Sequence, residues 1–186
     1  MGIYFEMYPV DPAVVRRTEE WLDEYTRERD DAFWAWEQDE SAPTEDPRSF
    51  YLLRYQHHYV NLINPYLEAA YGIDPYSWFA REQVKYGEDE YSEWYFLMSP
   101  DEVVTLTATL SKPARDVREE LDAFARDNLD MVGTRTPLEG LQTFGTTEPG
   151  TVDQFWGLID ALHVELRTFY QRMADNEQAM IGHFSG

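Results

Sequence analysis

The stretch TVDQFWGLIDALHVELRTFYQRMADNEQAMIGHF, residues 151–184, decides the fold. Its apolar residues recur at every third or fourth position, which predicts one long amphipathic helix. The helix begins at Thr151 or Asp153, both good N-cap residues, and ends near Asn176. Residues 179–184 then read as a short strand. The helix must bury its stripe against a sheet or neighbouring helices. That stripe consists of Phe155, Leu158, Ile159, Leu162, Leu166, Phe169 and Met173.

The segment before this helix contains the strongest local signal in the chain. The apolar residues 94–98 predict a strand, and Ser99-Pro100-Asp101-Glu102 predicts a helix start with a capping box. The buried face of that helix is expected to contain Val103, Leu106 and Leu110. A second helix is expected from about Pro113 to Asn128, and residues 130–150 have the composition of a loop.

The N-terminal part begins with a β-prone segment, residues 3–10, which predicts a strand. Asp11-Pro12 is a typical helix start, and helical spacing of apolar residues continues from there to about Arg29. The aromatic residues 33–36 follow, and residues 37–47 form a polar segment with two prolines, which predicts a loop.

The middle of the chain predicts a helix over residues 49–71. Pro65 is expected to break or kink it near Asn64, and Gly72 is a suitable C-terminal cap. A short helix is expected after Asp74-Pro75, and residues 87–92 predict an acidic turn.

These elements together predict the α+β class. The expected architecture is a small, mostly antiparallel sheet packed by several helices, with the long amphipathic helix before a short C-terminal strand. The chain has 186 residues and no segment composed like a long linker, so one domain over residues 1–186 is expected.

Composition excludes several functional classes. The 36 acidic and 15 basic residues give a net charge of -21, which excludes binding to nucleic acid through phosphate contacts and docking on an anionic membrane. The absence of cysteine excludes disulfides, thiol catalysis and thiolate zinc sites. The sequence shows no targeting signal and no apolar run long enough to span a bilayer, so we expect a cytoplasmic protein.

Three strings resemble the YfbM-like family of bacterial domains of unknown function. They are Met1-Gly2-Ile3-Tyr4 at the start, the strand and helix entry 95–103, and the helix segment 166–174 before the last apolar segment. The resemblance implies the α+β fold and brings no established catalytic residues. Relative to the family, residues of about 30–50 form an acidic and aromatic insertion.

The chemistry-bearing residues form no recognisable catalytic motif. Nucleophile elbows, phosphate-binding loops and zinc-protease motifs are missing from the sequence. His57 and His58 are adjacent, so on a helix they point in different directions, whereas His163 and His183 lie elsewhere. We therefore predict no catalytic residues, no metal site and no cofactor.

Aromatic residues are the one clear excess, and one group of them lies among acidic residues. Large aromatic side chains ringed by charge are typical of protein interfaces, although the same rings can pack down as a lid on the core. The predicted partner-binding residues are Trp34, Trp36, Asp30, Asp31, Glu37, Asp39 and Glu40.

The leading hypothesis is a non-enzymatic acidic module that binds a basic protein, for example as an immunity-type inhibitor of a nuclease toxin. The alternative is an enzyme or small-ligand-binding protein whose site is assembled from dispersed His, Tyr and carboxylate side chains. A third interpretation attributes the charge to a high-salt cytoplasm. The oligomeric state is left open.

Overall fold

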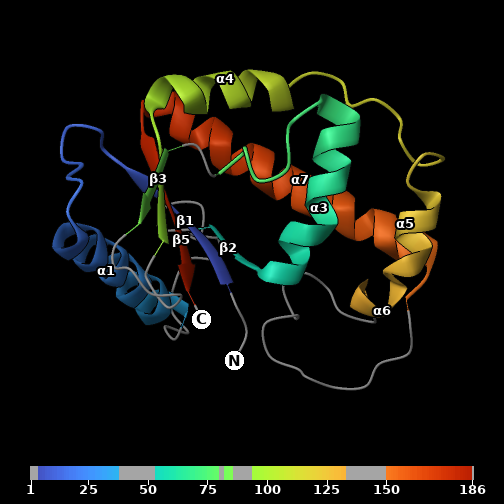
Figure 1. Cartoon of the computed structure of the whole chain (residues 1–186), viewed down its shortest axis with the longest axis horizontal. Helices are drawn as coiled ribbons and strands as arrows, with labels where there is room; N and C mark the ends of the chain where they lie inside the picture. Colours follow the sequence, from blue (N-terminus) through green and yellow to red (C-terminus); the bar gives the residue numbers. More distant parts are fainter. Residues whose placement is uncertain (1–3, 38–52, 80–81, 86–93, 133–149, 186) are drawn as a thin grey trace.

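The computed structural model describes residues 4–37, 53–79, 82–85, 94–132 and 150–185. The first part of the chain mixes strands and helices, four helices in succession follow the strand β4, and a last strand ends the described chain (Figure 1). The elements are β1 (Tyr4–Val10), α1 (Glu19–Glu37), β2 (Leu53–Gln56), α3 (His57–Tyr71), β3 (Glu82–Lys85), β4 (Trp94–Met98), α4 (Pro100–Leu110), α5 (Asp122–Asp127), α6 (Leu129–Val132), α7 (Val152–Asp175) and β5 (Ala179–Ser185).

The strands form one antiparallel sheet in the order β2-β1-β5-β4-β3. The strand β5 lies at the centre, and the long helix α7 leads directly into it. The predicted α+β class, with helices packed on a small antiparallel sheet, is therefore confirmed. So are the strands expected over 3–10, 94–98 and 179–184.

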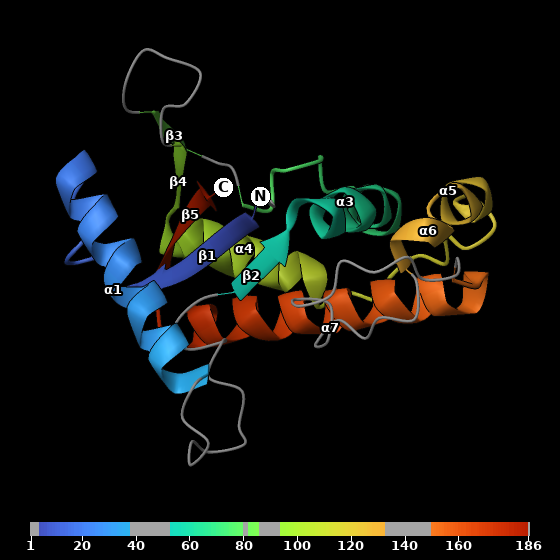
Figure 2. The same cartoon turned by 90° about the horizontal axis from the view of Figure 1, so that it is seen from below.

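The sheet separates two apolar cores, because side chains alternate between its faces. One face contributes Phe5, Met7, Phe96 and Met180 to a large core shared with α3, α4 and α7. The other face packs on α1 alone among the described helices, through a smaller core that includes Tyr8, Tyr95, Ile181, Leu22 and Phe33. Figure 2 shows α1 on one side of the sheet and α4 and α7 on the other.

Helix caps predicted from the sequence are present at the ends of three helices. Ser99 caps α4, and its capping box with Glu102 is complete. Thr151 caps α7 through the equivalent contacts with Gln154. Gly72 ends α3 with φ +69°, a left-handed conformation that glycine adopts without steric cost. All three predictions are confirmed, and the predicted stripe of α7 is buried.

The helix α1 differs at both ends from the prediction. Asp11 caps a turn instead of a helix, because its carboxylate accepts from the backbone N–H of Ala13 and its carbonyl accepts from that of Val14. The backbone N–H of Leu22 donates to the carbonyl of Thr18, and the helix begins at Glu19, seven residues after the predicted first residue Pro12. The helix then continues through residues 30–37 to Glu37, beyond the predicted end near Arg29.

The helix predicted over 49–71 is wrong in its first part. Residues 53–56 form the strand β2, which pairs with β1, and α3 begins only at His57. Pro65 does not end α3, because Leu62, Ile63, Tyr66 and Leu67 around it are buried and their packing offsets one lost backbone hydrogen bond.

Two other helix predictions need correction. Residues after Asp74-Pro75 form a turn, and residues 82–85 form β3. The side-chain oxygen of Asn64 holds this turn by accepting from the Trp78 indole N–H at 2.6 Å and the Tyr76 backbone N–H at 3.3 Å.

The helix expected over 113–128 is reduced to α5, and α6 occupies residues 129–132 of the region expected to be a loop. Arg115 instead runs back to α3, where its guanidinium donates to the carbonyl of Ala69 at 2.9 and 3.0 Å. The loops expected over 38–47 and 133–149 and the turn over 87–92 lie outside the described residues.

Candidate functional site

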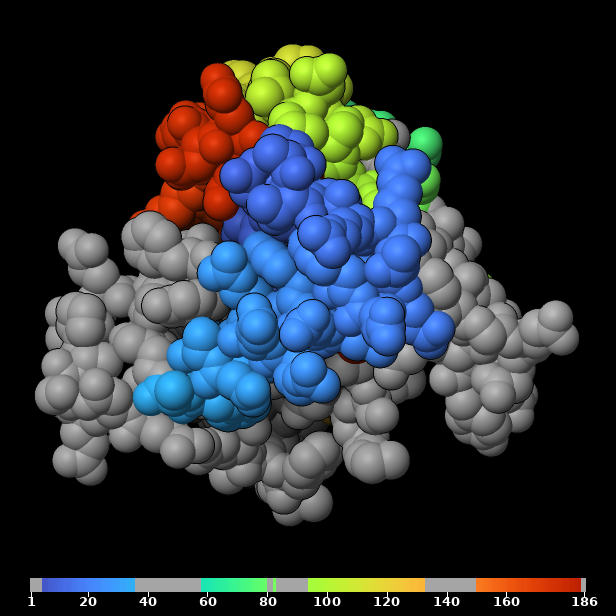
Figure 3. All heavy atoms as spheres, turned by 90° about the vertical axis from the view of Figure 1, so that its left-hand side faces the viewer, coloured from blue at the N-terminus to red at the C-terminus, as the bar shows by residue number. Residues whose placement is uncertain are grey.

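The outer face of α1 is the most acidic element surface that the structure describes. The helix contains eight acidic residues and two arginines in 19 residues. Its acidic side chains at positions 19, 20, 23, 24, 28 and 31 are exposed. Figure 3 shows α1 and the segment before it spread across this side of the molecule. The outer face of α1 is therefore mostly acidic, with the exposed Arg27 among its carboxylates.

The structure places the predicted partner-binding residues unequally. Asp31 is exposed and Trp34 is 41% exposed, so both side chains are accessible on α1. Asp30 is only half-exposed, because its carboxylate turns inward and accepts a hydrogen bond from Tyr8 at 3.2 Å. Trp36 and Glu37 belong to the last turn of α1, and their side chains lie outside the described set, as do Asp39 and Glu40 entirely.

Of the aromatic residues at the end of α1, one packs into the core as a lid and another is exposed, as a residue in a protein interface would be. Phe33 is 2% exposed and packs into the smaller core, as a lid residue would. Trp34 lies edge-to-face against it, with ring centroids 5.5 Å apart, and remains on the surface. The buried ring fixes the helix while the exposed ring is available for contact.

Polar contacts attach α1 to the sheet along its length. The hydroxyl of Tyr95 donates to Asp23 at 2.5 Å, and the hydroxyl of Tyr25 donates to the backbone carbonyl of Pro9 at 2.6 Å. The Tyr8–Asp30 contact lies nearer the C-terminal end of the helix. These hydroxyl contacts add to the apolar attachment that the buried Leu22 and Phe33 side chains give α1.

Glu6, His183 and Tyr95 form a row across the centre of the sheet beneath α1, which we call the Glu6–His183–Tyr95 row. Glu6 is opposite His183 in the β1–β5 register, and Tyr95 is opposite His183 in the β4–β5 register. Nδ1 of His183 lies 3.5 Å from Oε2 of Glu6, and the rings of His183 and Tyr95 stack at 4.7 Å. Glu6 is fully buried, and the His183 side chain is 12% exposed.

Tyr8 connects this row to α1. Its hydroxyl lies 2.9 Å from Oε2 of Glu6 and 3.2 Å from Asp30, so one phenolic proton is placed between two carboxylates. Burial raises the pKa of Tyr8 far above its usual range, and the charges of Glu6 and Asp30 raise it further. Tyr8 therefore stays protonated and acts as a donor at every physiological pH.

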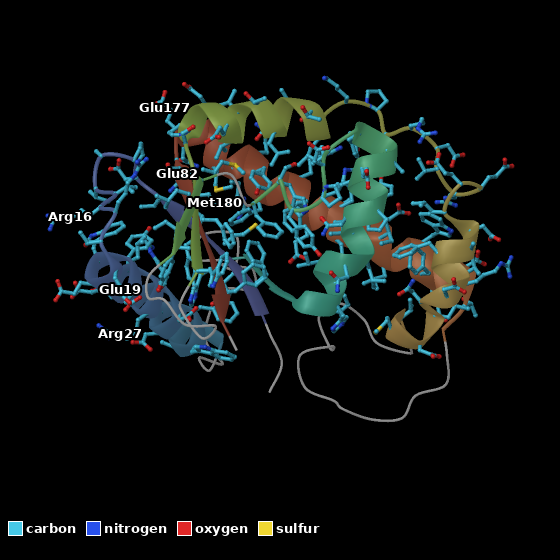
Figure 4. The ribbon with its side chains drawn as sticks, in the orientation of Figure 1. Arg16, Glu19, Arg27, Glu82, Glu177 and Met180 are labelled. Carbon is cyan, nitrogen blue, oxygen red and sulfur yellow. The ribbon has the colours of Figure 1, made fainter. Side chains whose placement is uncertain are left out.

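A depression of about 440 Å³ lies at the N-terminal half of α1. The Trp21 ring stacks on Tyr25 at 5.1 Å, and Arg29 packs over the same Tyr25 ring at 5.1 Å. Figure 4 shows Arg16 and Glu19 on the outer side of the molecule here. The depression is polar and open, and it is lined by Arg16, Thr18, Glu20, Trp21, Asp23, Glu24 and Arg27.

A second polar cluster lies between α3 and α7, on the opposite side of the sheet. Tyr71 is hydrogen-bonded to Nε2 of His163 at 2.8 Å, and Tyr66 is hydrogen-bonded to Tyr71. Burial lowers the pKa of His163, and the charge of Arg167 lowers it further. The contact with Tyr71 is therefore a hydrogen bond between a phenol and a neutral imidazole. Burial also raises the pKa of Tyr66 to about 12, so this cluster contains no activated phenolate.

The remaining histidines and carboxylates do not assemble a metal site within the described ranges. His58 is half-buried and packs against the ring of Tyr59 at 4.1 Å, and the side chain of His57 lies outside the described set. No group of three or more His, Asp or Glu side chains is close enough to hold an ion in the described part of the chain. Among the same residues, no helix is both long and apolar enough to cross a membrane.

Comparison with known proteins adds no family assignment. No protein-family model matches the chain, and neither a curated protein nor a solved structure is significantly similar to it.

Sequence reasoning identified the exposed part of α1 and missed the row beneath it. Glu6 lies between Phe5 and Met7, and His183 lies in the last apolar strand. The available signal was a charged or titratable residue in an otherwise apolar strand. This signal does not show that residues 6, 95 and 183 are neighbours, because their pairing depends on the register of three strands.

Proposed function

We propose that this protein is a non-enzymatic acidic module that binds a basic protein through the outer face of α1. An immunity-type inhibitor of a basic toxin such as a nuclease is the concrete form of this function. The observation that carries the proposal is the exposed surface of α1, which presents acidic side chains along the helix and the accessible Trp34 beside Asp31. Charge steers a basic partner toward such a face, and a large aromatic ring anchors it.

The placement of α1 supports the same function. The helix covers one face of the sheet and leaves its own outer face without a further layer among the described elements (Figure 2). Its inner contacts with Tyr8, Tyr95 and Pro9 hold it in a defined orientation. A fixed acidic helix loses little conformational entropy when a partner binds. Membership of the YfbM-like family and a cytoplasmic location remain part of this proposal.

The test compares two variants with equal loss of charge. The first neutralises exposed carboxylates of α1 by Glu20→Gln, Glu24→Gln, Glu28→Gln and Asp31→Asn. The matched control neutralises four exposed carboxylates elsewhere by Glu68→Gln, Glu119→Gln, Asp127→Asn and Asp130→Asn. The basic partner is captured with the wild-type chain at low salt and identified by mass spectrometry, and its affinity is then measured for each purified variant.

We expect the α1 variant to bind at least about tenfold more weakly and the control to change by less than about twofold, because only contacting charges contribute strongly. The wild-type affinity should fall as salt rises. Equal weakening by both variants would show that net charge alone attracts the partner. Binding that is insensitive to salt and to both variants would reject the proposal.

An alternative function is catalysis or small-ligand binding at a dispersed His/Tyr site. The observation that favours it is the hydrogen-bonded Tyr66–Tyr71–His163 cluster, in which a phenol is hydrogen-bonded to a neutral imidazole. NMR titration with small anions and amines separates the two functions. A ligand of this site shifts the His163 ring resonances at stoichiometric concentration and leaves the amides of α1 unchanged.

A further inference from the structure

The Glu6–His183–Tyr95 row contains titratable groups that the proposed docking face does not itself use. Glu6 is fully buried at the centre of the sheet, and a buried carboxylate is costly unless charge or hydrogen bonds compensate it. His183 supplies one such compensation from the neighbouring strand, with its Nδ1 at 3.5 Å. The charge on His183 therefore matters for everything that contacts Glu6.

Tyr8 contacts both Glu6 and the helix α1. Its single hydroxyl proton lies between Glu6 at 2.9 Å and Asp30 at 3.2 Å. These two carboxylates repel each other, and a positive charge on His183 offsets that repulsion. When His183 becomes neutral, the repulsion acts on Asp30, which belongs to α1.

A second connection runs from His183 to α1 on the other side of the row. The Tyr95 ring lies flat on the imidazole, with ring centroids 4.7 Å apart and an interplanar angle of 12°. A cationic ring in this position is attracted by the aromatic face, and a neutral one is attracted less. The hydroxyl of the same Tyr95 donates to Asp23 of α1 at 2.5 Å.

We infer that the protonation of His183 controls how tightly α1 is held on the sheet, so that this helix loosens as the imidazole loses its proton. The contacts described above carry the inference that His183 affects the attachment of α1. The further consequence, that partner binding at α1 responds to pH, rests on the proposed function. The charged and titratable groups that the structure describes around His183 come from three elements: Glu6 and Tyr8 in β1, Tyr95 in β4, and Asp23 and Asp30 in α1.

The first test follows the full chain by NMR, without any partner. The ring resonances of His183 and the backbone amides of Asp23 and Asp30 are titrated from about pH 5 to about pH 8.5, the range in which histidine changes charge. The inference requires the amides to move with the same midpoint as the His183 ring. Amides that do not shift, or that follow another midpoint, would overturn it.

The second test measures hydrogen exchange of residues 22–33, corrected for the intrinsic effect of pH on exchange. We expect protection about tenfold lower at about pH 8 than at about pH 6. His183→Gln, which is neutral at both pH values, should show the lower protection at both. The matched control His163→Gln, on the other side of the sheet, should keep the wild-type response.

Persistence of the wild-type pH response in His183→Gln would overturn the inference and would point to another titrating group. None of these measurements uses the partner, so a failed docking test leaves them interpretable.

Discussion

Two histidines lie in contrasting surroundings on the two faces of the sheet. His183 lies beside a buried carboxylate, whereas His163 is half-buried among Tyr66, Tyr71 and Arg167 and is hydrogen-bonded to Tyr71. Burial and the charge of Arg167 lower the pKa of His163 below its ordinary value. The neutral form is therefore part of the folded structure at the α3–α7 contact.

The lowered pKa of His163 gives a stability prediction with a definite sign. The unfolded chain takes up the proton first, so the His163 contribution is complete above the ordinary histidine pKa of 6.5 and is lost as the pH falls below that value toward the folded pKa. Chemical denaturation of wild-type protein and His163→Gln between about pH 7.5 and about pH 5 measures this contribution. The variant should lose less stability on acidification, and equal slopes for the two proteins would contradict the assignment.

Helices whose first turn carries its own capping signal could be predicted almost to the residue. The helices α4 and α7 begin where Ser99 and Thr151 accept from the backbone, and these contacts use residues at most three positions away. The strands β2 and β3 were missed because each has only four residues. In addition, β2 pairs with the distant strand β1, where Arg54 lies opposite Glu6. The exposed Asp31 and Trp34 could be predicted from composition, whereas the buried row required the register.

The capping contact of α4 predicts a measurable loss of helix stability. Ser99→Ala removes the acceptor for the Glu102 backbone N–H and should lower the free energy of unfolding by about 1 kcal/mol. Ser111→Ala, at the C-cap of the same helix, is a matched control, since its side chain has no capping role there. Urea denaturation measures both variants, and a comparable loss in the two would show that the capping box contributes nothing specific.

The whole molecule combines a net charge of -21 with two apolar cores. Repulsion among surface carboxylates destabilises the compact state, and salt screens it. Burial of large side chains on both faces of the sheet opposes that repulsion without any help from salt. The two interpretations of the charge therefore differ at low ionic strength. Adaptation to high salt implies that the protein unfolds there, whereas the binding interpretation implies that it stays folded.

We expect the protein to remain folded at about 20 mM salt, with a Tm that rises by several degrees on going to about 1 M as screening takes effect. Far-UV and near-UV circular dichroism during thermal unfolding measures both quantities. Loss of near-UV signal at low salt, restored by molar salt, would instead identify adaptation to a high-salt cytoplasm as the reason for the charge.

The central position of β5 has a consequence for how the chain reaches its native state. Removing that one strand from the order β2-β1-β5-β4-β3 leaves two separate two-stranded ribbons, each with a long unpaired edge. Closing the sheet joins residues as distant as Tyr4 and Ser185, so it is entropically expensive and slow relative to formation of α7. Until closure, both edges can pair with other chains, and aggregation competes with folding during that interval.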